Sequence, residues 1–491
     1  PSDPESAIFG TKITDRFFLV EPGGDIAFIT GALKHLLEKD GLNQRFIEEH
    51  THNFAALKAS VLKAKWEDLE TSSGMSKAEM LEFARMLLSA DKAVLVWSMG
   101  VTQHTIAEDT VQAIVNLGLA RGYLGREGCG LMPIRGHSGV QGGAEMGAYA
   151  TVLPGGVPIT PENVEKLSQE WGFAVPAAPG LTVTEMLEAA SQGNLDLLWS
   201  VGGNFLETLP DPQDAADALS KLPLRVHQDI VLSSQMLVGG EEVILLPATT
   251  RYEVPGGVSE TSTERRVIFS PEIPGPRIAE ARPEFEALLE VAKRCRMDLA
   301  DKLSFADTAA IREEIARVIP LYDGIQHLRA KGDAFQYGGP QLCPGGVCPT
   351  PDGHANFKVV EIPTRTLPPG AFHLATRRGK QFNSMVHEAK DPVSGAPRDA
   401  VLMNVADVAR LKLHGGQRIW LRNEFGVMEG QVFIAEIKRG TLQVHWPEGN
   451  VLLDPNLRSP KAKVPAYKES YAFVEKEDPS GCENQSLAAA R

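Results

Sequence analysis

The class of fold follows from residues 93–147, which read AVLVWSMGVTQHTIAEDTVQAIVNLGLARGYLGREGCGLMPIRGHSGVQGGAEMG. Residues 93–97 are apolar and rich in branched side chains, a pattern typical of a strand buried on both faces. Residues 98–104 form a loop of small and hydrogen-bonding side chains. Thr105 is a plausible N-cap for the next helix, in which apolar residues recur at helical spacing as far as Leu119. This order predicts a loop at the carboxyl end of a parallel strand, where doubly wound folds bind ligands.

The segment after this helix is rich in glycine. Residues 134–143 read IRGHSGVQGG, with four glycines beside one arginine, one histidine and one serine. Glycines let backbone N–H groups approach a ligand closely, and the guanidinium of Arg135 offers a permanently charged fork to an anion. The pattern predicts an anion-binding loop. The alternative is a mobile surface loop with a solvated arginine.

Three runs in this region resemble a known family: WSMGVTQHT (97–105), LGREGCG (124–130) and PIRGHSGVQG (133–142). They are similar to catalytic subunits of formate dehydrogenase-like molybdopterin oxidoreductases, in the branch of uncertain substrate. The resemblance implies a bis-molybdopterin guanine dinucleotide cofactor holding molybdenum or tungsten. Two positions depart from the pattern: Ser98 replaces a frequent glycine, and His137 stands where formate dehydrogenases usually have glutamine.

The same resemblance assigns roles to side chains. It implies that Arg135 contacts a small anionic substrate beside the metal, with His137 as a second catalytic candidate. His104 and His137 are candidates for pterin hydrogen bonds or proton transfer. The cofactor-binding candidates of this region are Gly100, Thr102, Gln103, His104, Gly136 and Ser138.

An earlier strand, loop and helix is predicted between Asp15 and Asp40. Residues 17–20 are the expected strand, and Asp25 is the expected helix cap. The resemblance places Gly24 and Asp25 near the nucleotide end of the cofactor. The alternative is a simple capped turn.

Composition excludes several functional classes. The formal net charge of −14 argues against nonspecific binding to nucleic acid or to an anionic membrane. No apolar run approaches the ~20 residues of a membrane span. Five scattered cysteines fit a reducing cytosol, so we expect a cytoplasmic protein. Cys343 and Cys348 are the one close pair in the sequence, interpreted as buried thiols in preference to a metal site.

A second strand-and-helix series follows residues 152–180, a Pro- and Gly-rich stretch expected to be a loop between domains. Its strands are expected at residues 195–199, 224–227 and 243–247. The resemblance implies that the loops after the first two hold one pterin guanine dinucleotide; without it, the second loop is only a polar loop. The residues concerned are Gly202, Gly203, Asn204, Gln228 and Asp229.

The C-terminal part is predicted to be a closed β-barrel. Short alternating strands with glycine turns are expected at residues 372–376, 418–422, 427–434 and 441–445. The resemblance implies a double-psi barrel that covers both pterins. The basic residues at 377, 378 and 380 suit a pyrophosphate, or else form a solvated turn. The implied cofactor contacts are Thr376, Arg377, Asn383, His445, Asn450 and Lys468.

The expected fold class is α/β, with two αβα parallel-sheet domains of doubly wound type followed by the barrel. The expected divisions are residues 1–147 (latter part of a molybdopterin-binding domain), 148–279 (second dinucleotide-binding-like domain), 280–365 (helical linker), 366–478 (barrel) and 479–491 (disordered tail).

The resemblance runs from about residue 9 to residue 474 and begins inside the family pattern. The Cys or selenocysteine that ligates the metal in relatives lies upstream of that point, and Cys129 does not match its position. We therefore expect a C-terminal portion, or one subunit of a split enzyme, that is inactive alone. An iron–sulfur cluster is expected only if an N-terminal segment supplies it.

The predicted function is two-electron oxidation of formate or another small anion. The expected partners are the N-terminal segment or a companion electron-transfer subunit, and a further copy of the chain is possible. The alternative is a scaffold relative that keeps the fold and binds no cofactor.

Overall fold

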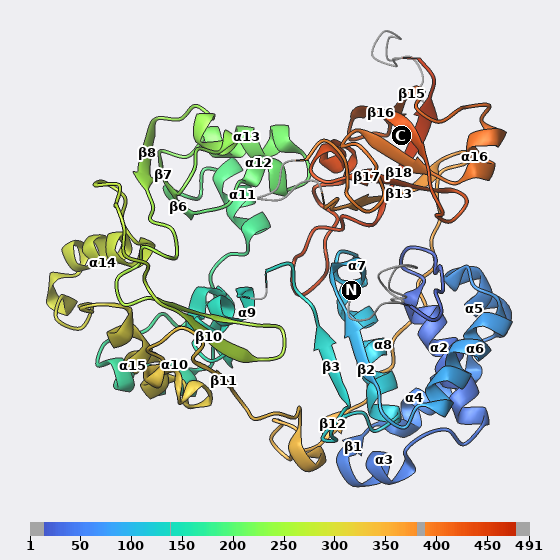
Figure 1. Ribbon diagram of the computed structural model, residues 1–491, viewed down its shortest axis with the longest axis horizontal. Helices are drawn as coiled ribbons and strands as arrows, with labels where there is room; N and C mark the ends of the chain where they lie inside the picture. Colours follow the sequence, from blue (N-terminus) through green and yellow to red (C-terminus); the bar gives the residue numbers. More distant parts are fainter. Residues whose placement is uncertain (1–13, 138, 381–387, 478–491) are drawn as a thin grey trace, which may run out of the picture.

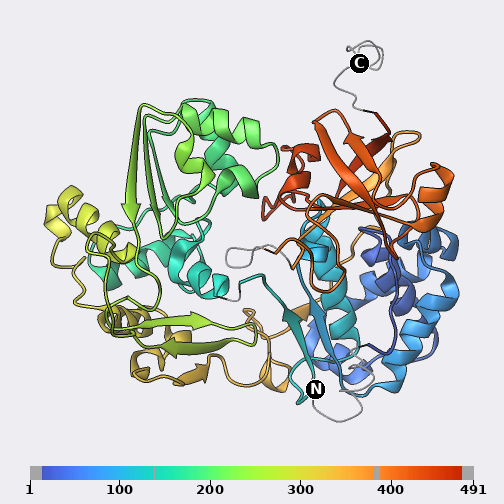
Figure 2. The ribbon, with the colours of Figure 1, turned by 45° about the horizontal axis from the view of Figure 1, so that its top comes forward.

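The computed structural model describes residues 14–137, 139–380 and 388–477. Its elements form two lobes (Figures 1 and 2). One lobe contains the N-terminal helices with the β2–β3 pair, and the C-terminal barrel lies on top of it. The other lobe contains the β6–β8 sheet and the helices α10 to α15. No helix in the described ranges is both long and apolar enough to cross a bilayer.

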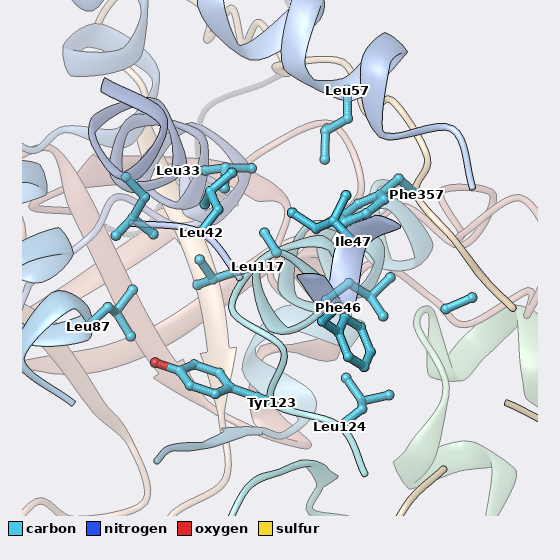
Figure 3. Packing of buried hydrophobic residues seen from close by; sticks show 14 of the residues in the cluster. Leu33, Leu42, Phe46, Ile47, Leu57, Leu87, Leu117, Tyr123, Leu124 and Phe357 are labelled. Carbon is cyan, nitrogen blue, oxygen red and sulfur yellow. The ribbon is translucent and has the colours of Figure 1, made fainter. Parts of the chain in front are cut away.

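The N-terminal lobe is built from amphipathic helices that share one core. Leu33 of α2, Leu117 of α8 and Phe357 point into a common interior (Figure 3), and each is at most 3% exposed. Each such buried side chain stabilises the fold by roughly 1.5–3 kcal/mol. The helices are α2 (Asp25–Glu38), α3 (Gln44–His50), α4 (Phe54–Lys63), α5 (Trp66–Ser73), α6 (Lys77–Ser89), α7 (Met99–Thr102) and α8 (Ala107–Ala120).

Two local predictions for the first unit are wrong. Residues 17–20 are not a strand but an irregular segment, although the aromatic ring of Phe18 packs on Phe28 and Phe83. Asp25 is the first helical residue of α2 and Gly24 is its cap position, with no side-chain capping bond. The packing of an aromatic cluster, not a sheet partner, fixes this segment.

The predicted central strand is β2 (Val94–Trp97), paired in parallel with β3 (Gly130–Pro133). The expectation of burial on both faces is wrong. Val94 and Val96 are 43% and 51% exposed, whereas Leu95 packs against the core formed by the helices. The helices of the described ranges cover one face of this pair, so apolar composition alone overstates its burial.

The other lobe contains a three-stranded parallel sheet in the order β6-β7-β8. Helices α11 and α13 cover it through a core that includes Leu198 and Leu219. The expected loop between domains is wrong in part, because residues 161–171 within it form helix α10, capped by Thr160. The elements here are α9 (Val140–Gly143), η1 (Ala144–Ala148), β4 (Val152–Leu153), β5 (Val157–Pro158), α10 (Pro161–Trp171), α11 (Val183–Ser191), β6 (Leu197–Val201), α12 (Phe205–Thr208), α13 (Pro212–Ser220), β7 (Leu224–Asp229), η2 (Ser234–Leu237) and β8 (Glu242–Pro247).

An antiparallel sheet of order β11-β10-β9 and two helices complete this lobe. After β11 the chain crosses to the N-terminal lobe, where β12 pairs in parallel with β1 (Figure 1). The elements are β1 (Thr51–His52), β9 (Val258–Thr261), β10 (Arg266–Ser270), α14 (Glu284–Cys295), η3 (Met297–Leu299), α15 (Thr308–Val318), η4 (Pro320–Tyr322), η5 (Ile325–His327), β11 (Ala334–Gln336), η6 (Pro344–Gly346) and β12 (Ala355–Asn356).

The predicted closed barrel is confirmed. Its strands run in the order β13-β17-β14-β16-β15-β18, around a core that includes Leu374, Val401 and Leu442, all fully buried. The sequence indicated four of these strands and missed β14 and β18. The elements are β13 (Phe372–Arg377), β14 (Ala400–Met403), α16 (Val405–Arg410), β15 (Arg418–Arg422), β16 (Val427–Ile434), β17 (Thr441–His445), η7 (Glu448–Leu452) and β18 (Ser470–Glu475).

Candidate cofactor and anion site

Two loops leave the same edge of the β2–β3 pair. The strands are in parallel register at this edge, and the backbone N–H of Ile134 donates to the carbonyl of Trp97 at 2.7 Å. The first loop, residues 98–104, begins with α7 and is called the polar loop. The second loop carries Arg135 and is called the arginine loop. A Cβ added at Gly136 would lie 3.6 Å from the Cε of Met99 in α7. The polar loop and the arginine loop therefore pack against each other.

The polar loop combines open space with a buried imidazole. A Cβ added at Gly100 would meet no described atom within 4 Å, whereas His104 is only 2% exposed. Nε2 of His104 lies 3.1 Å from the carbonyl of Gly100, which closes the loop on itself. Thr102 ends α7 and is half-buried.

The turn before α2 closes on Arg365. Gly23 has a φ of +75°, and a Cβ there would lie 2.2 Å from the Arg365 guanidinium. A Cβ at Gly24 would lie 2.6 Å from a carbonyl of α5. Close packing thus explains why both positions are glycine.

Burial raises the pKa of the Asp25 carboxyl, against the opposing charges of His104 and Arg365.

A buried charged network joins the polar loop to the barrel. Arg365 lies 3.2 Å from Nδ1 of His104 and 3.3 Å from Nδ1 of His373. Glu469 accepts hydrogen bonds from the backbone N–H and the hydroxyl of Thr105, both at 2.9 Å. Burial alone would raise the pKa of Glu469, but the neighbouring imidazole, the Thr105 N–H and the guanidinium hold that pKa at about 2.

This network corrects the role expected for Thr105. The structure places the start of α8 at residue 107 and its cap position at residue 106, with no side-chain capping bond. The backbone N–H and the hydroxyl of Thr105 both donate hydrogen bonds to Glu469 of the barrel instead. A tertiary partner has replaced the local cap.

Three barrel cations lie beside the network. The ammonium of Lys468 donates to the carbonyl of Thr376. Burial, and then the charges of Arg377 and Arg378, lowers the pKa of Lys468 to about 8. The guanidinium of Arg378 lies 4.3 Å from the ring centre of Trp446. Since neither a carbonyl nor an indole neutralises a positive charge, the group suits an anion such as a phosphate.

Several predicted contact residues also have structural partners. The hydroxyl of Thr376 donates to the carbonyl of Tyr467 at 2.9 Å. Nδ1 of His445 lies 3.1 Å from a barrel carbonyl. The carbonyl of Gln103 accepts the backbone N–H of Lys468 at 3.1 Å. The first two bonds lie within the barrel and the third holds the barrel against the polar loop, and cofactor contacts by these side chains stay predictions.

A second group of predicted residues gathers at the carboxyl ends of β6 and β7. Gly202 and Gly203 have φ values of +67° and +80°, and a Cβ at either would meet no described atom within 4 Å. Within the described ranges, Oδ1 of Asn204 and Oε1 of Gln228 are buried without a hydrogen-bond partner. The carboxylate of Asp229 accepts the N–H of the next residue at 2.7 Å. Open backbone and unpaired acceptors fit a ligand rich in N–H and O–H donors.

Gln235 supports this second group and was not predicted. It is 1% exposed. Its Oε1 accepts the N–H of Phe205 at 2.9 Å, and its Nε2 donates to the carbonyl of Gly203 at 2.8 Å. Gln235 therefore holds the glycine turn open. Its sequence context, within an expected loop, gives no signal of this role.

Asn450 joins the barrel to the second lobe. Its amide donates to the carbonyls of Glu207 and Leu209, both at 3.1 Å. Nearby, the hydroxyl of Tyr467 donates to the carbonyl of Thr208. Three successive carbonyls at the end of α12 are thus bound by the barrel, which places the barrel between the two groups of predicted residues.

The arginine loop is anchored but accessible. An N–H of Arg135 donates to the carbonyl of Pro133 at 3.2 Å, and Arg135 is half-buried while His137 is exposed. The N–H of Gly142 donates to the hydroxyl of Thr261 at 3.0 Å, so the loop reaches the second lobe. The predicted residues Ser138 and Asn383 lie outside the described residues.

These groups fit a phosphate-bearing dinucleotide with a heterocycle at each end. Within the described residues no salt bridge pairs Lys468, Arg377 or Arg378, so these cations suit phosphates. The acceptors near Gly202 that lack a described partner suit a purine edge or ribose hydroxyls. Residues 46–294 match the molybdopterin oxidoreductase family, and residues 372–471 match the molybdopterin dinucleotide-binding domain. The chain belongs to the molybdopterin oxidoreductase family.

The relatives that this chain matches differ in how far they are characterised. It is 27% identical to protein YdeP of Escherichia coli over 93% of this chain and 63% of the relative. An uncharacterized oxidoreductase of Mycobacterium tuberculosis is also 27% identical. The F420-dependent formate dehydrogenase subunit alpha of Methanocaldococcus jannaschii is 28% identical, over 95% of this chain and 71% of that relative. The chain thus spans less than two thirds of the length of YdeP.

The fold of this chain is also seen in a solved structure. Acetylene hydratase from Pelobacter acetylenicus aligns over 93% of this chain and 71% of its own, with a TM-score of 0.68 and 16% sequence identity. The resemblance stated from the sequence and the mixed α/β fold with a terminal barrel are both confirmed.

The residues that hold the polar loop in place were not predicted from the sequence. Arg365, His373 and Glu469 were not singled out, although each contacts or neighbours His104. Arg365 is 261 positions from His104. A lone arginine in a proline-rich stretch carries no periodic signal, so only the folded arrangement identifies it.

Proposed function

We propose that this chain binds a bis-molybdopterin guanine dinucleotide cofactor holding molybdenum or tungsten, and contributes to a formate dehydrogenase-like oxidation of a small anion. When bound, the cofactor supplies the two-electron redox chemistry. Support comes from two separate groups of side chains, one cationic beside Lys468 and one with unpaired acceptors near Gly202, with the barrel between them. A cofactor with two nucleotide ends requires two such binding sites.

The protein residues bind and orient in this proposal. Lys468, Arg377 and Arg378 would hold phosphates by charge-assisted hydrogen bonds. Asn204, Gln228 and Asp229 would accept hydrogen bonds from a guanine edge or a ribose. His104 is buried and both of its ring nitrogens have polar neighbours, so it would act by holding the polar loop in place beside the pterin.

Arg135 would orient the anionic substrate. Its loop continues into α9 and η1, where Nε2 of Gln141 donates to Glu145 at 2.8 Å and Tyr322 donates to the same carboxylate. Those bonds fix the far end of the loop, while the Arg135 side chain remains half-buried. A planar guanidinium can bind a carboxylate through two parallel bonds, which favours one orientation of a small acid.

The test is Arg135→Ala in the complete protein, expressed in a host that makes the cofactor. Loss of a charge-assisted bond worth ~1.5–3 kcal/mol should lower kcat/KM for formate about ten- to a hundredfold at unchanged metal content. Arg126→Ala is the matched control, since Arg126 pairs with Asp91 at the surface of the same region. Unchanged kinetics in a fully metal-loaded Arg135→Ala enzyme would exclude this role.

Electron transfer would require a companion subunit or an iron–sulfur segment, in keeping with the alpha-subunit designation of the Methanocaldococcus relative. Formate is the first substrate to assay, with an artificial electron acceptor. A metal-loaded enzyme that oxidises another small anion and not formate would keep the cofactor assignment and change the substrate.

A further inference from the structure

A cluster of two histidines and one aspartate lies far from the cofactor residues, where the chain crosses between lobes. His52 ends β1, and Asp352 and His354 lie in the turn that leads into β12 (Figure 1). The potential ligand atoms of the three side chains all lie within 4.8 Å of one another. They come from segments 300 positions apart, so the fold and not a local motif brings them together.

The geometry of the cluster is close to that of a metal site. Nε2 of His52 lies 2.8 Å from Oδ2 of Asp352, and Nδ1 of His354 lies 4.0 Å from Oδ1 of Asp352. Ligands bound at about 2.0–2.1 Å in a tetrahedral arrangement lie roughly 3.3 Å from one another. The observed separations bracket that distance. The rings of His52 and His354 are stacked with centroids 4.7 Å apart, and Nδ1 of His354 also lies 2.8 Å from the carbonyl of Asp352, so both rings must rotate to bind one ion.

The carboxylate is already oriented and ionised. Oδ1 of Asp352 accepts the backbone N–H of His354 at 3.1 Å and faces the hydroxyl of Thr350 at 3.4 Å, which turns Oδ2 toward His52. The His354 N–H first, and then His52, lowers the pKa of Asp352 to about 2. A cation therefore meets a ready carboxylate.

We propose that His52, Asp352 and His354 form a second metal site, which binds a divalent transition ion of the zinc class and fastens the crossing segment to the N-terminal lobe. Two imidazoles and one carboxylate are ligands that suit zinc, whereas magnesium and calcium prefer oxygen alone. The side chains of His52, Asp352 and His354 are 47%, 57% and 37% exposed, so an ion can enter and water can complete the coordination.

The nearby thiols are poorer ligands for the same ion. Cys343 and Cys348 are both buried and form no disulfide, as the sequence predicted. Burial raises the pKa of the Cys343 thiol to about 12, and a metal requires the thiolate. The ion is thus expected on nitrogen and oxygen ligands, which a visible absorption spectrum can distinguish from sulfur ligands.

In the test, the untagged chain is first freed of metal with a chelator. It is then titrated with Zn²⁺ in competition with a chromogenic chelator. One equivalent should bind, and Asp352→Asn and His354→Ala should each weaken binding at least tenfold. Asp352→Asn keeps an acceptor for the turn. His414→Ala, on an exposed barrel histidine that also faces a nearby carbonyl, is the control and should bind as the native chain does.

Co²⁺ provides a second measurement on the native chain, which does not depend on the variants folding. Visible absorption of tetrahedral or five-coordinate cobalt without a thiolate charge-transfer band is expected. A thiolate band would place the ion on the cysteines and overturn the proposal. Native affinity in both site variants, or no binding of either ion by the native chain, would overturn it as well.

Discussion

The guanidinium of Arg365 lies between His104 and His373 and also donates to the carbonyl of Pro22. It reaches this position because Gly23 has no side chain to block it. The imidazole of His373, buried beside this permanent positive charge, is disfavoured in its protonated form. At the scale of the residue, the site therefore depends on a neutral His373 and one closely packed glycine.

The pH dependence of folding should report this arrangement. Burial, and then the charge of Arg365, lowers the pKa of His373 to about 4 from an ordinary 6.5. The folded chain therefore binds fewer protons than the unfolded chain between these values, and the stability that His373 contributes above pH 6.5 is lost as the pH falls toward 4. We expect this group to cost about 2 kcal/mol of unfolding free energy between pH 7 and pH 5.

The measurement is urea unfolding at both pH values for the native chain and His373→Gln. Glutamine can still donate to the carbonyl of Lys468, as Nε2 of His373 does at 2.8 Å, but it does not titrate. The variant should show the smaller pH dependence. The exposed His327→Gln should behave as the native chain, and equal pH dependence in all three would contradict the assignment.

At the scale of the element, the loops that follow the parallel strands β2 and β6 leave glycine backbone open. β6 ends at Val201 and is followed by Gly202 and Gly203, and β7 runs on through Gln228 to Asp229. The sequence placed these loops correctly because strand ends are local features. Gln235, which fixes the glycine turn, arrives from a separate 3₁₀ segment.

Asp229→Ala should weaken retention of the guanine nucleotide end. Its carboxylate bonds one backbone N–H of the described chain, so its loss should leave the fold intact. A lost charge-assisted bond of ~1.5–3 kcal/mol predicts about ten- to a hundredfold weaker binding. The readout is guanine nucleotide released by acid from purified protein, with the exposed Asp217→Ala as control. Equal nucleotide content in the two variants would remove Asp229 from the site.

At the scale of the whole molecule, the barrel is the part that meets both lobes. Glu469 and Lys468 bind the polar loop of the first lobe, and Asn450 and Tyr467 bind the end of α12 in the second. A cofactor with two nucleotide ends would then lie between surfaces that the barrel holds in register.

Removing the Asn450 amide should loosen that junction. Asn450→Ala leaves two carbonyls near α12 without their donor, at a cost of about 1–3 kcal/mol. Amide hydrogen exchange in residues 205–211 should accelerate, whereas exchange in the barrel strands should not. Asn456→Ala, on an exposed asparagine of the same region, is the control. Unchanged exchange in residues 205–211 would show that other contacts hold the barrel there.

Local sequence determined most of the elements and the family. Periodicity located β2, α8, the β6–β8 strands and four of the six barrel strands, because each pattern repeats within a few residues. The capping box of Ser76 and Glu79 at the start of α6 is a local feature of the same kind. The glycine-rich loop carried the family resemblance, and the domain boundaries and cofactor roles inferred from it stay predictions.

Tertiary structure alone decided which side chains meet. Thr105 and Glu469 are 364 positions apart, and His52 and Asp352 are 300 apart. The burial of β2 was misjudged for the same reason, since apolar residues indicate a tendency to be covered and not the element that covers them. Contacts between distant segments depend on how several elements pack at once, and one sequence holds no local pattern for that packing.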